Sequence, residues 1–267
     1  MNPRLRRPGR LAATLMLAAA SFSPALAASP ALAAAPQDSQ TPPPPHRELS
    51  PEQHADIFMA RKNNADAVDY YYRALKQASF KDPQLWNKLG IAFQQENKFH
   101  NARQAYAKST KVDPDFAEGW NNLGTVYFME SKYGKSVSYY QRAIKLKNDT
   151  AAFHMNLGTS YYHLKKYDLS VEEYRTALGI DPKVAVQQSA LGTTIHAGGA
   201  DPEFYFYMAK AYASIGNADE AVRYLRRALE DGFEGTKQLD DDPDFKKISE
   251  YPAYIELRRN PPVAIKN

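Results

Sequence analysis

The sequence predicts an all-α fold built from repeated helical hairpins. Three stretches share one pattern, in which Trp or His, a Leu-Gly pair and an aromatic residue recur at the same offsets: Trp86 to Phe93, Trp120 to Tyr127, and His154 to Tyr161. Their glycines, Gly90, Gly124 and Gly158, are 34 residues apart each time. A fixed period of this length is typical of a solenoid, in which each unit buries its apolar side only by stacking on its neighbours.

Each unit is expected to contain two helices. Trp120, Gly124 and Tyr127 fall on one stripe of a helix with 3.6 residues per turn. A small residue, Ser136, and a tyrosine, Tyr140, follow on the stripe of a second helix. We expect the glycine and the small residue to let the two helices approach closely, while the tyrosines fill the space beside the contact. A short break between the helices then makes a hairpin.

This pattern resembles the tetratricopeptide repeat, a 34-residue helix-turn-helix unit with the signature W-x2-L-G-x2-Y…A-x3-F…P. Two weaker copies, at Ala55 to Ala74 and Ala209 to Ala228, extend the array. The resemblance implies a right-handed superhelical solenoid of about five such repeats with a C-terminal cap. The expected array, 50–235, has five repeats: 48–81, 83–116, 117–150, 151–184 and 202–235. Asp-Pro pairs beginning at 82, 113, 181 and 201 place proline at or near helix starts.

Residues 1–27 have the order of a secretory signal peptide. Four arginines without an acidic residue precede an apolar run, Leu11 to Ala20, and small residues that end at Ala27. A second candidate cleavage site ends at Ala33. An uncleaved membrane anchor is the alternative, but the segment is short, alanine-dominated and interrupted by a proline. The sequence therefore predicts an exported protein, periplasmic or secreted, and leaves the general and twin-arginine routes open.

Residues 28–49 predict a disordered linker, because the stretch is rich in proline and alanine and lacks an apolar period. Ser50 and Gln53 then have the spacing of a capping box at the start of the first helix. The chain carries 34 Lys and Arg against 30 Asp and Glu, and loss of the four signal-peptide arginines leaves equal numbers. For this near-neutral mature chain we expect no nucleic-acid partner and no stable membrane insertion after signal cleavage.

The interval before the fifth repeat exceeds the period by 17 residues. We expect this insert, 185–201, to be largely irregular, because Gly192, Gly198 and Gly199 disfavour a continuous helix. Two interpretations remain: a tolerated spacer, or a segment that borders or partly covers the binding groove.

Residues 236–260 predict a C-terminal helical cap, with a helix beginning at Asp242. Four apolar residues are placed to cover the exposed edge of the fifth repeat: Phe245, Ile248, Tyr254 and Leu257. The Asp-Pro turn followed by Pro-x-aromatic resembles a closing motif of many bacterial tetratricopeptide proteins. A calcium site in the aspartate run is the alternative, but the run lacks the glycine and the distal glutamate of a calcium loop.

The sequence predicts no catalytic residue, no metal site and no cofactor. Its six histidines form no His-x3-His pair, it has no cysteine, and no glycine loop of the phosphate-binding type occurs. His154 stands where the sister repeats have tryptophan, so we expect it to be a packing residue. The chain is therefore not expected to be an enzyme.

Binding residues are expected on the first helix of each repeat, opposite the packing stripe. In the family these helices line a concave groove that binds extended peptides or partner helices, as the resemblance implies here. The expected peptide-binding groove comprises Asn87, Lys88, Asn121, Asn122, Thr125, Phe128, Met129, Met155, Asn156, Thr159 and Tyr162. We expect Phe128, Met129, Met155 and Tyr162 to be exposed beside the amides, an arrangement that favours peptide binding.

Asn122 and Asn156 each lie two residues before a repeat glycine. They resemble the asparagine ladder with which the sugar-transferring member of the family grips a peptide backbone. We expect both to project away from the packing stripe, where an amide offers a donor and an acceptor together. The alternative is that they cap or tether neighbouring helices. The basic residues with which other members hold a chaperone's C-terminal carboxylate are absent at the corresponding offsets.

These observations predict a non-catalytic scaffold that binds a peptide or a partner protein in the concave groove of the solenoid, in the cell envelope. The alternative is a structural subunit of an envelope assembly, for outer-membrane or pilus biogenesis, docked through its edge or convex surfaces. The style of the signal peptide and the closing motif imply a bacterial protein. The sequence does not identify the partner.

Overall fold

The computed structural model describes residues 48–185 and 201–264, which all fall in one compact unit, Arg47–Asn267. The predicted signal peptide, nearly all of the linker and the insert except its two ends lie outside these residues. The described residues form α-helices and one short 3-10 helix, with no strand, so the prediction of an all-α solenoid is confirmed.

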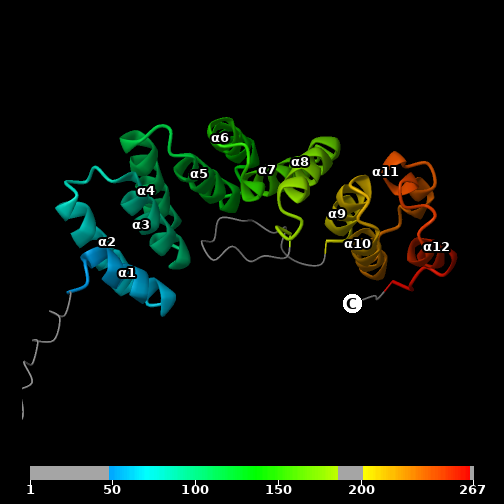
Figure 1. The fold of residues 1–267 in the computed structure, drawn as a ribbon, viewed down its shortest axis with the longest axis horizontal. Coiled ribbons are helices and arrows are strands. Elements are labelled where there is room, and N and C mark those ends of the chain that lie inside the picture. The colour runs from blue at the N-terminus through cyan, green and yellow to red at the C-terminus, as the bar shows by residue number, and fades with distance from the viewer. Residues whose placement is uncertain (1–47, 186–200, 265–267) are drawn as a thin grey trace, which may run out of the picture. The chain divides into compact units, whose positions relative to one another are not determined.

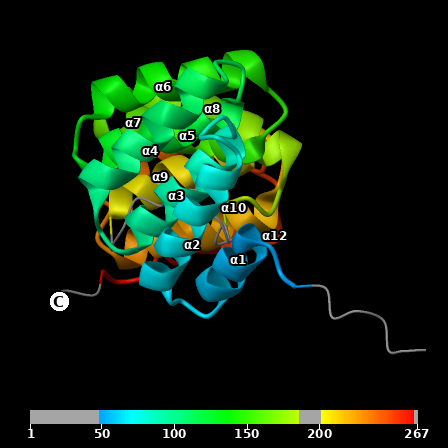
Figure 2. The same cartoon turned by 90° about the vertical axis from the view of Figure 1, so that its left-hand side faces the viewer.

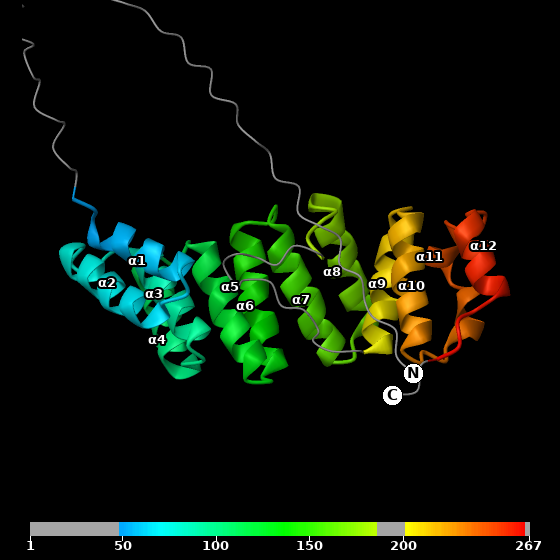
Figure 3. The same ribbon diagram turned by 90° about the horizontal axis from the view of Figure 1, so that it is seen from below.

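Ten helices pair into five hairpins that follow one another in chain order (Figures 1 and 3). The first helices of the hairpins are α1 (Pro51–Ala60), α3 (Pro83–Gln95), α5 (Ala117–Met129), α7 (Ala151–His163) and α9 (Pro202–Ser214). The second helices are α2 (Asn64–Gln77), α4 (Phe99–Val112), α6 (Tyr133–Leu146), α8 (Tyr167–Ile180) and α10 (Ala218–Glu230).

Each hairpin packs on the next through its second helix. α2 contacts α3, α4 contacts α5, α6 contacts α7, and α8 contacts α9. The first helices also touch along the array, because α3 packs on α5 and α5 on α7. Figure 2 looks along the row of hairpins, and in it α6 lies above α5 and α7. The molecule therefore has a layer of first helices and a layer of second helices.

The repeat glycines provide seats for tyrosine rings. A Cβ atom added to Gly124 would lie 2.8 Å from Cε1 of the buried Tyr140, and one added to Gly158 would lie 2.7 Å from Tyr174. Gly90 and Tyr106 repeat the arrangement. The predicted close approach of the two helices is therefore present. At the contact, a tyrosine ring of the second helix lies against the glycine of the first.

The hairpin turns share one backbone geometry. Lys62, Asn97, Ser131 and Lys165 have φ between 57° and 59°, in the left-handed region. In the third hairpin the Lys132 N–H then donates to the Tyr127 carbonyl at 2.8 Å. This is the Schellman ending of a helix, which satisfies a carbonyl that the helix leaves open. The same ending recurs in all five hairpins, so each second helix leaves its turn in the same way.

Helix starts follow the sequence in part. Ser50 and Gln53 form the predicted capping box on α1. The Asp82 and Asp201 carboxylates accept from backbone N–H groups at the starts of α3 and α9. The other two Asp-Pro pairs lie in turns, where Asp113 and Asp181 accept from backbone N–H groups two residues on. Proline thus begins a helix at two of its four predicted places.

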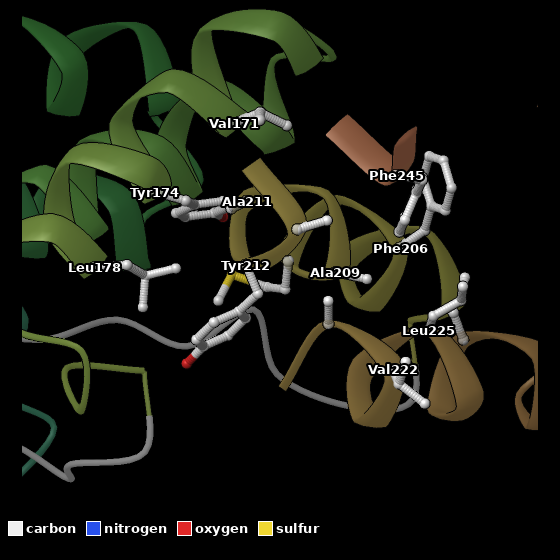
Figure 4. Packing of buried hydrophobic residues seen from close by; sticks show 14 of the residues in the cluster. Val171, Tyr174, Leu178, Phe206, Ala209, Ala211, Tyr212, Val222, Leu225 and Phe245 are labelled. Carbon is white, nitrogen blue, oxygen red and sulfur yellow. The ribbon is translucent and has the colours of Figure 1, made fainter. Parts of the chain in front are cut away.

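The C-terminal end is closed by two short helices, as predicted. α11 (Pro243–Lys246) packs on α9, and α12 (Pro252–Arg259) packs on α10. All four predicted cap residues are buried: Phe245, Ile248, Tyr254 and Leu257. Figure 4 shows Phe245 beside Phe206 of α9, and Tyr174 and Leu178 of α8 facing Tyr212. One apolar cluster therefore runs from the fourth hairpin into the cap.

Candidate functional site

Four asparagines link the first helices of three successive repeats. The Asn122 side chain on α5 donates to the Asn87 side-chain oxygen on α3 at 2.9 Å. Asn156 on α7 donates to Asn121 on α5 at 3.0 Å, and Asn121 donates to Asn122 at 3.0 Å. These four residues, the amide network, form a chain of side-chain hydrogen bonds across the first-helix layer.

The expectation that Asn122 and Asn156 line an exposed groove is wrong. Asn122 is 2% exposed and Asn156 is fully buried, and each is bonded to a first helix of the neighbouring repeat. The helical period placed both residues correctly, opposite the Trp-Leu-Gly stripe. Adjacent first helices lie close enough on that side for the amides to meet, so the tethering alternative describes their observed contacts.

Four more of the predicted groove residues are buried. Met155 is 2% and Tyr162 is 6% exposed, so the expectation that both are exposed is wrong. The Tyr162 hydroxyl donates to Asp201, the residue that caps α9, at 2.5 Å. Thr125 and Thr159 accept from the glycine-seated tyrosines, Tyr140 and Tyr174, at 3.2 and 3.3 Å. These side chains hold helices together.

Three predicted groove residues reach the surface. Met129, at the end of α5, is 46% exposed. Phe128 is half-buried, with its ring edge-on to His163 of α7 at a centroid distance of 5.1 Å. Lys88 on α3 forms ion pairs with Glu52 and Asp56 on α1, each at 2.8 Å. The first two offer apolar surface, whereas the Lys88 charge is already met by two carboxylates.

A hollow of about 690 Å³ lies between the first two hairpins. It is lined by Asp56, Met59, Ala60, Lys62, Asn64, Tyr71, Lys88, Ile91 and Gln95. Burial lowers the pKa of the Lys88 ammonium, but the hydrogen bonds to Asp56 and Glu52 outweigh it and raise that pKa. The Tyr71 hydroxyl donates to Asp56 at 2.6 Å, and burial with this carboxylate raises its pKa. Lys88 thus stays charged and Tyr71 stays neutral.

Residues of α1, α2 and α3 line the hollow, and the repeat period places residues of α5 at equivalent positions. Ala60, Gln95 and Met129 occupy equivalent positions of α1, α3 and α5, and α3 packs on α5. We call the mixed apolar and amide surface at these ends the first-helix strip: Met59, Ala60, Ile91, Gln95, Phe128 and Met129. The expected peptide-binding groove did not include its α1 members. Carrying the offsets of Phe128 and Met129 back through the weak first repeat would have found Met59 and Ala60.

The described part of the chain brings together no three side chains of the metal-binding types. His154 is buried, and its ring nitrogens face the Glu173 carboxylate at 2.7 Å and the Asn148 carbonyl at 3.1 Å. In the third repeat the Trp120 indole donates to the Pro114 carbonyl at the same offset. No helix in 48–185 or 201–264 is both long and apolar enough to cross a bilayer.

Comparison with known families agrees with this geometry. A family model described as tetratricopeptide repeat matches residues 87–149 and 131–185, and a second model of the same description matches 202–230. These matches support the tetratricopeptide repeat family for the hairpins from α3 to α8 and for α9 with α10. The comparison with curated proteins found no match.

Several solved structures are similar to the chain. A crystal structure of MamA is 23% identical, covers 74% of this chain and 97% of its own, and superposes with a TM-score of 0.48. MamA 41-end from Desulfovibrio magneticus RS-1 is 14% identical and has a TM-score of 0.49. The match covers 67% of this chain and 92% of that one. The Sgt2 TPR domain from Aspergillus fumigatus is 22% identical and has a TM-score of 0.42. The match covers 44% of this chain and 79% of that one.

Proposed function

We propose that this protein is a non-catalytic scaffold that binds an extended segment of a partner protein along the first-helix strip. The observation that carries the proposal is the hollow of about 690 Å³ between α1 and α3. The exposed Met129 occupies the position of α5 that is equivalent to Gln95 at the hollow. Repeated hairpins supply such a surface because each one adds an equivalent row of side chains.

The chemistry of the strip favours apolar anchors over charge. Met59 and Met129 offer thioether surface, and the buried Ile91 lines the hollow. Methionine adapts to differently shaped partners. Two lysines, Lys62 and Lys88, line the hollow, and Lys88 is already paired with Glu52 and Asp56. A bound segment would therefore place apolar side chains in the hollow, while its backbone pairs with polar groups at the rim such as Gln95 and Asn64.

The amide network is excluded from this proposal as a direct ligand. Its buried side chains hold the first helices in register, so they would position the strip without touching the partner. Partner binding then depends on these asparagines only through the spacing of α3, α5 and α7.

The cell envelope remains the proposed location. The support is the basic, apolar and small-residue order of residues 1–27, which suits export and cleavage. Intact-mass measurement of exported protein should give a mature N-terminus between residues 28 and 36. Retention of residues 1–27 would contradict the proposal and favour an anchor.

Binding is tested with a peptide selected from a random displayed library against the full mature chain. Met59→Glu and Met129→Glu would each bring a charge to the strip, and we expect each to weaken the Kd by about tenfold or more. Leu169→Glu is the matched control, because Leu169 is 48% exposed on the second helix α8. An equal loss of peptide affinity in the control, or no loss of affinity in the strip variants, would contradict the proposal.

A further inference from the structure

The second helices of repeats two and three carry charge of only one sign. α4 and α6 together contain six basic residues and no acidic one. We call these six the basic patch: Arg103, Lys108, Lys111, Lys135, Arg142 and Lys145. The neighbouring second helices are mixed, because α2 contains Asp66 and Asp69, and α8 contains Asp168, Glu172 and Glu173.

The patch lies on the surface in matched rows. Lys108, Lys111, Lys135 and Lys145 are exposed, and Arg103 and Arg142 are half-exposed. Lys108 and Arg142 occupy the same register of their helices, as do Lys111 and Lys145, since each pair is 34 residues apart. Lys111 and Lys145 stand in last turns, where a cation also complements the helix dipole. That stabilisation does not apply to Lys108, which precedes the last turn of α4, or to Lys135, which lies in the first turn of α6.

Aromatic rings form the floor of the patch. Tyr139 is stacked between Tyr127 and Trp120, at centroid distances of 5.0 and 6.0 Å. Arg103 and Lys135 lie 5.8 and 5.5 Å from the Tyr127 ring centre. The arginine at the other end of the stack, Arg142, lies 5.9 Å from Trp120. Three of the six cations therefore lie around one three-ring stack.

The patch already binds one carboxylate. Glu130, in the turn between α5 and α6, accepts from Arg103 at 3.0 Å and from Lys132 at 2.7 Å. The hydrogen bond from Lys132 and the charge of Arg103 lower the pKa of the Glu130 carboxyl despite some desolvation. One carboxylate among these cations leaves the remaining basic residues in excess.

We propose that the basic patch on α4 and α6 is a second docking surface, which binds an acidic segment of a partner protein. Charge complementarity and the bound Glu130 identify carboxylates as the ligand chemistry. Single-stranded nucleic acid is disfavoured, because bases bind on free aromatic faces and these rings are stacked on one another with cations at both ends. The surface is separate from the first-helix strip, so it does not depend on the proposed function.

The test uses the full mature chain and a labelled peptide of Glu and Asp, with its Gln and Asn counterpart as the neutral probe. We expect the acidic peptide to bind more tightly than the neutral one. Its affinity should fall as salt rises from about 0.1 M to about 1 M, because the Debye screening length shortens from about 10 Å to about 3 Å. Changing Lys108, Lys135 and Lys145 to Gln should weaken binding on the order of tenfold. The matched control changes three exposed cations elsewhere, Arg226, Lys237 and Lys246, to Gln.

Both triple variants are first checked by thermal unfolding monitored by circular dichroism. The proposal is overturned if the patch variant and the control bind the acidic peptide equally, or if the neutral peptide binds as well as the acidic one. Tighter binding to duplex DNA or to phosphatidylglycerol vesicles, lost in the same patch variant, would assign the surface to those ligands and also overturn it. Strip variants that no longer bind the library-selected peptide should still bind the acidic peptide. The two proposals can therefore fail separately.

Discussion

Single asparagines decide how the first helices of this array meet. Asn122 donates to Asn87 and accepts from Asn121, so one buried side chain is bonded to two others. The sequence placed Asn122 on the correct side of its helix, because the helical period fixes direction. It could not predict burial, because burial depends on how closely α3, α5 and α7 approach, and no single-helix pattern contains that distance.

We expect Asn122→Ala to lower the free energy of unfolding by about 1–3 kcal/mol, because the Asn87 side-chain oxygen and the Asn121 NH2 group each lose their bond to Asn122. Asn101→Ala is the matched control, since Asn101 is exposed on α4 and should change stability by less than about 0.5 kcal/mol. Urea unfolding of both variants measures the difference. Equal stabilities would contradict the structural role of the amide network.

His154 gives the fourth repeat a pH dependence that the third lacks. Both of its ring nitrogens face acceptors, Glu173 and the Asn148 carbonyl, an arrangement that only the protonated ring satisfies fully. The hydrogen bond that the His154 ring donates to Glu173 outweighs burial and raises the His154 pKa above its ordinary value of 6.5. The pair therefore stabilises the fold fully below about pH 6.5, and this contribution is lost as pH rises through the folded-state pKa.

We expect Glu173→Gln to destabilise the protein more at about pH 5.5 than at about pH 9, by on the order of 1–3 kcal/mol at the lower pH. Thermal or urea unfolding at both pH values measures the difference. His100→Gln, at an exposed histidine, serves as the control. A cost for Glu173→Gln that does not change with pH would show that the pair is not charged.

At the scale of a helix pair, the glycine seat sets the distance between first and second helix. Tyr140 and Tyr174 are fully buried and lie against Gly124 and Gly158. This element could be predicted from sequence, because glycine, the small residue and tyrosine recur at fixed offsets in three repeats. The turn geometry was less visible, since Lys62, Ser131 and Lys165 adopt a left-handed backbone that favours glycine or asparagine.

We expect Gly124→Ala to lower stability by about 1–3 kcal/mol, because its methyl group would displace the buried Tyr140 ring. Gly134→Ala on α6 is the matched control, since a Cβ there meets no atom within 4 Å. That variant should be neutral or up to about 1 kcal/mol more stable, as alanine favours helix. Thermal unfolding that ranks the two variants in the opposite order would contradict the claim that Tyr140 needs a glycine at position 124.

At the scale of the whole molecule, stacking presents two surfaces of different chemistry. The first-helix strip is largely apolar, and the basic patch on α4 and α6 is cationic. The repeat period predicted the order of the hairpins and the cap, because these depend on side chains that recur. It did not predict the hollow, because the hollow depends on how α1, in the weak first repeat, lies beside α3, where Lys88 pairs with Glu52 and Asp56.

The central claim, that a partner segment lies along the first-helix strip, is tested most directly by site-specific photo-crosslinking in the full mature chain. A photoreactive phenylalanine analogue replaces either Gln95, exposed at the hollow, or Leu169, exposed on the second helix α8. With the library-selected peptide, we expect a crosslink at position 95 that unlabelled peptide competes away, and none at position 169. A competed crosslink at position 169 without one at position 95 would contradict the account.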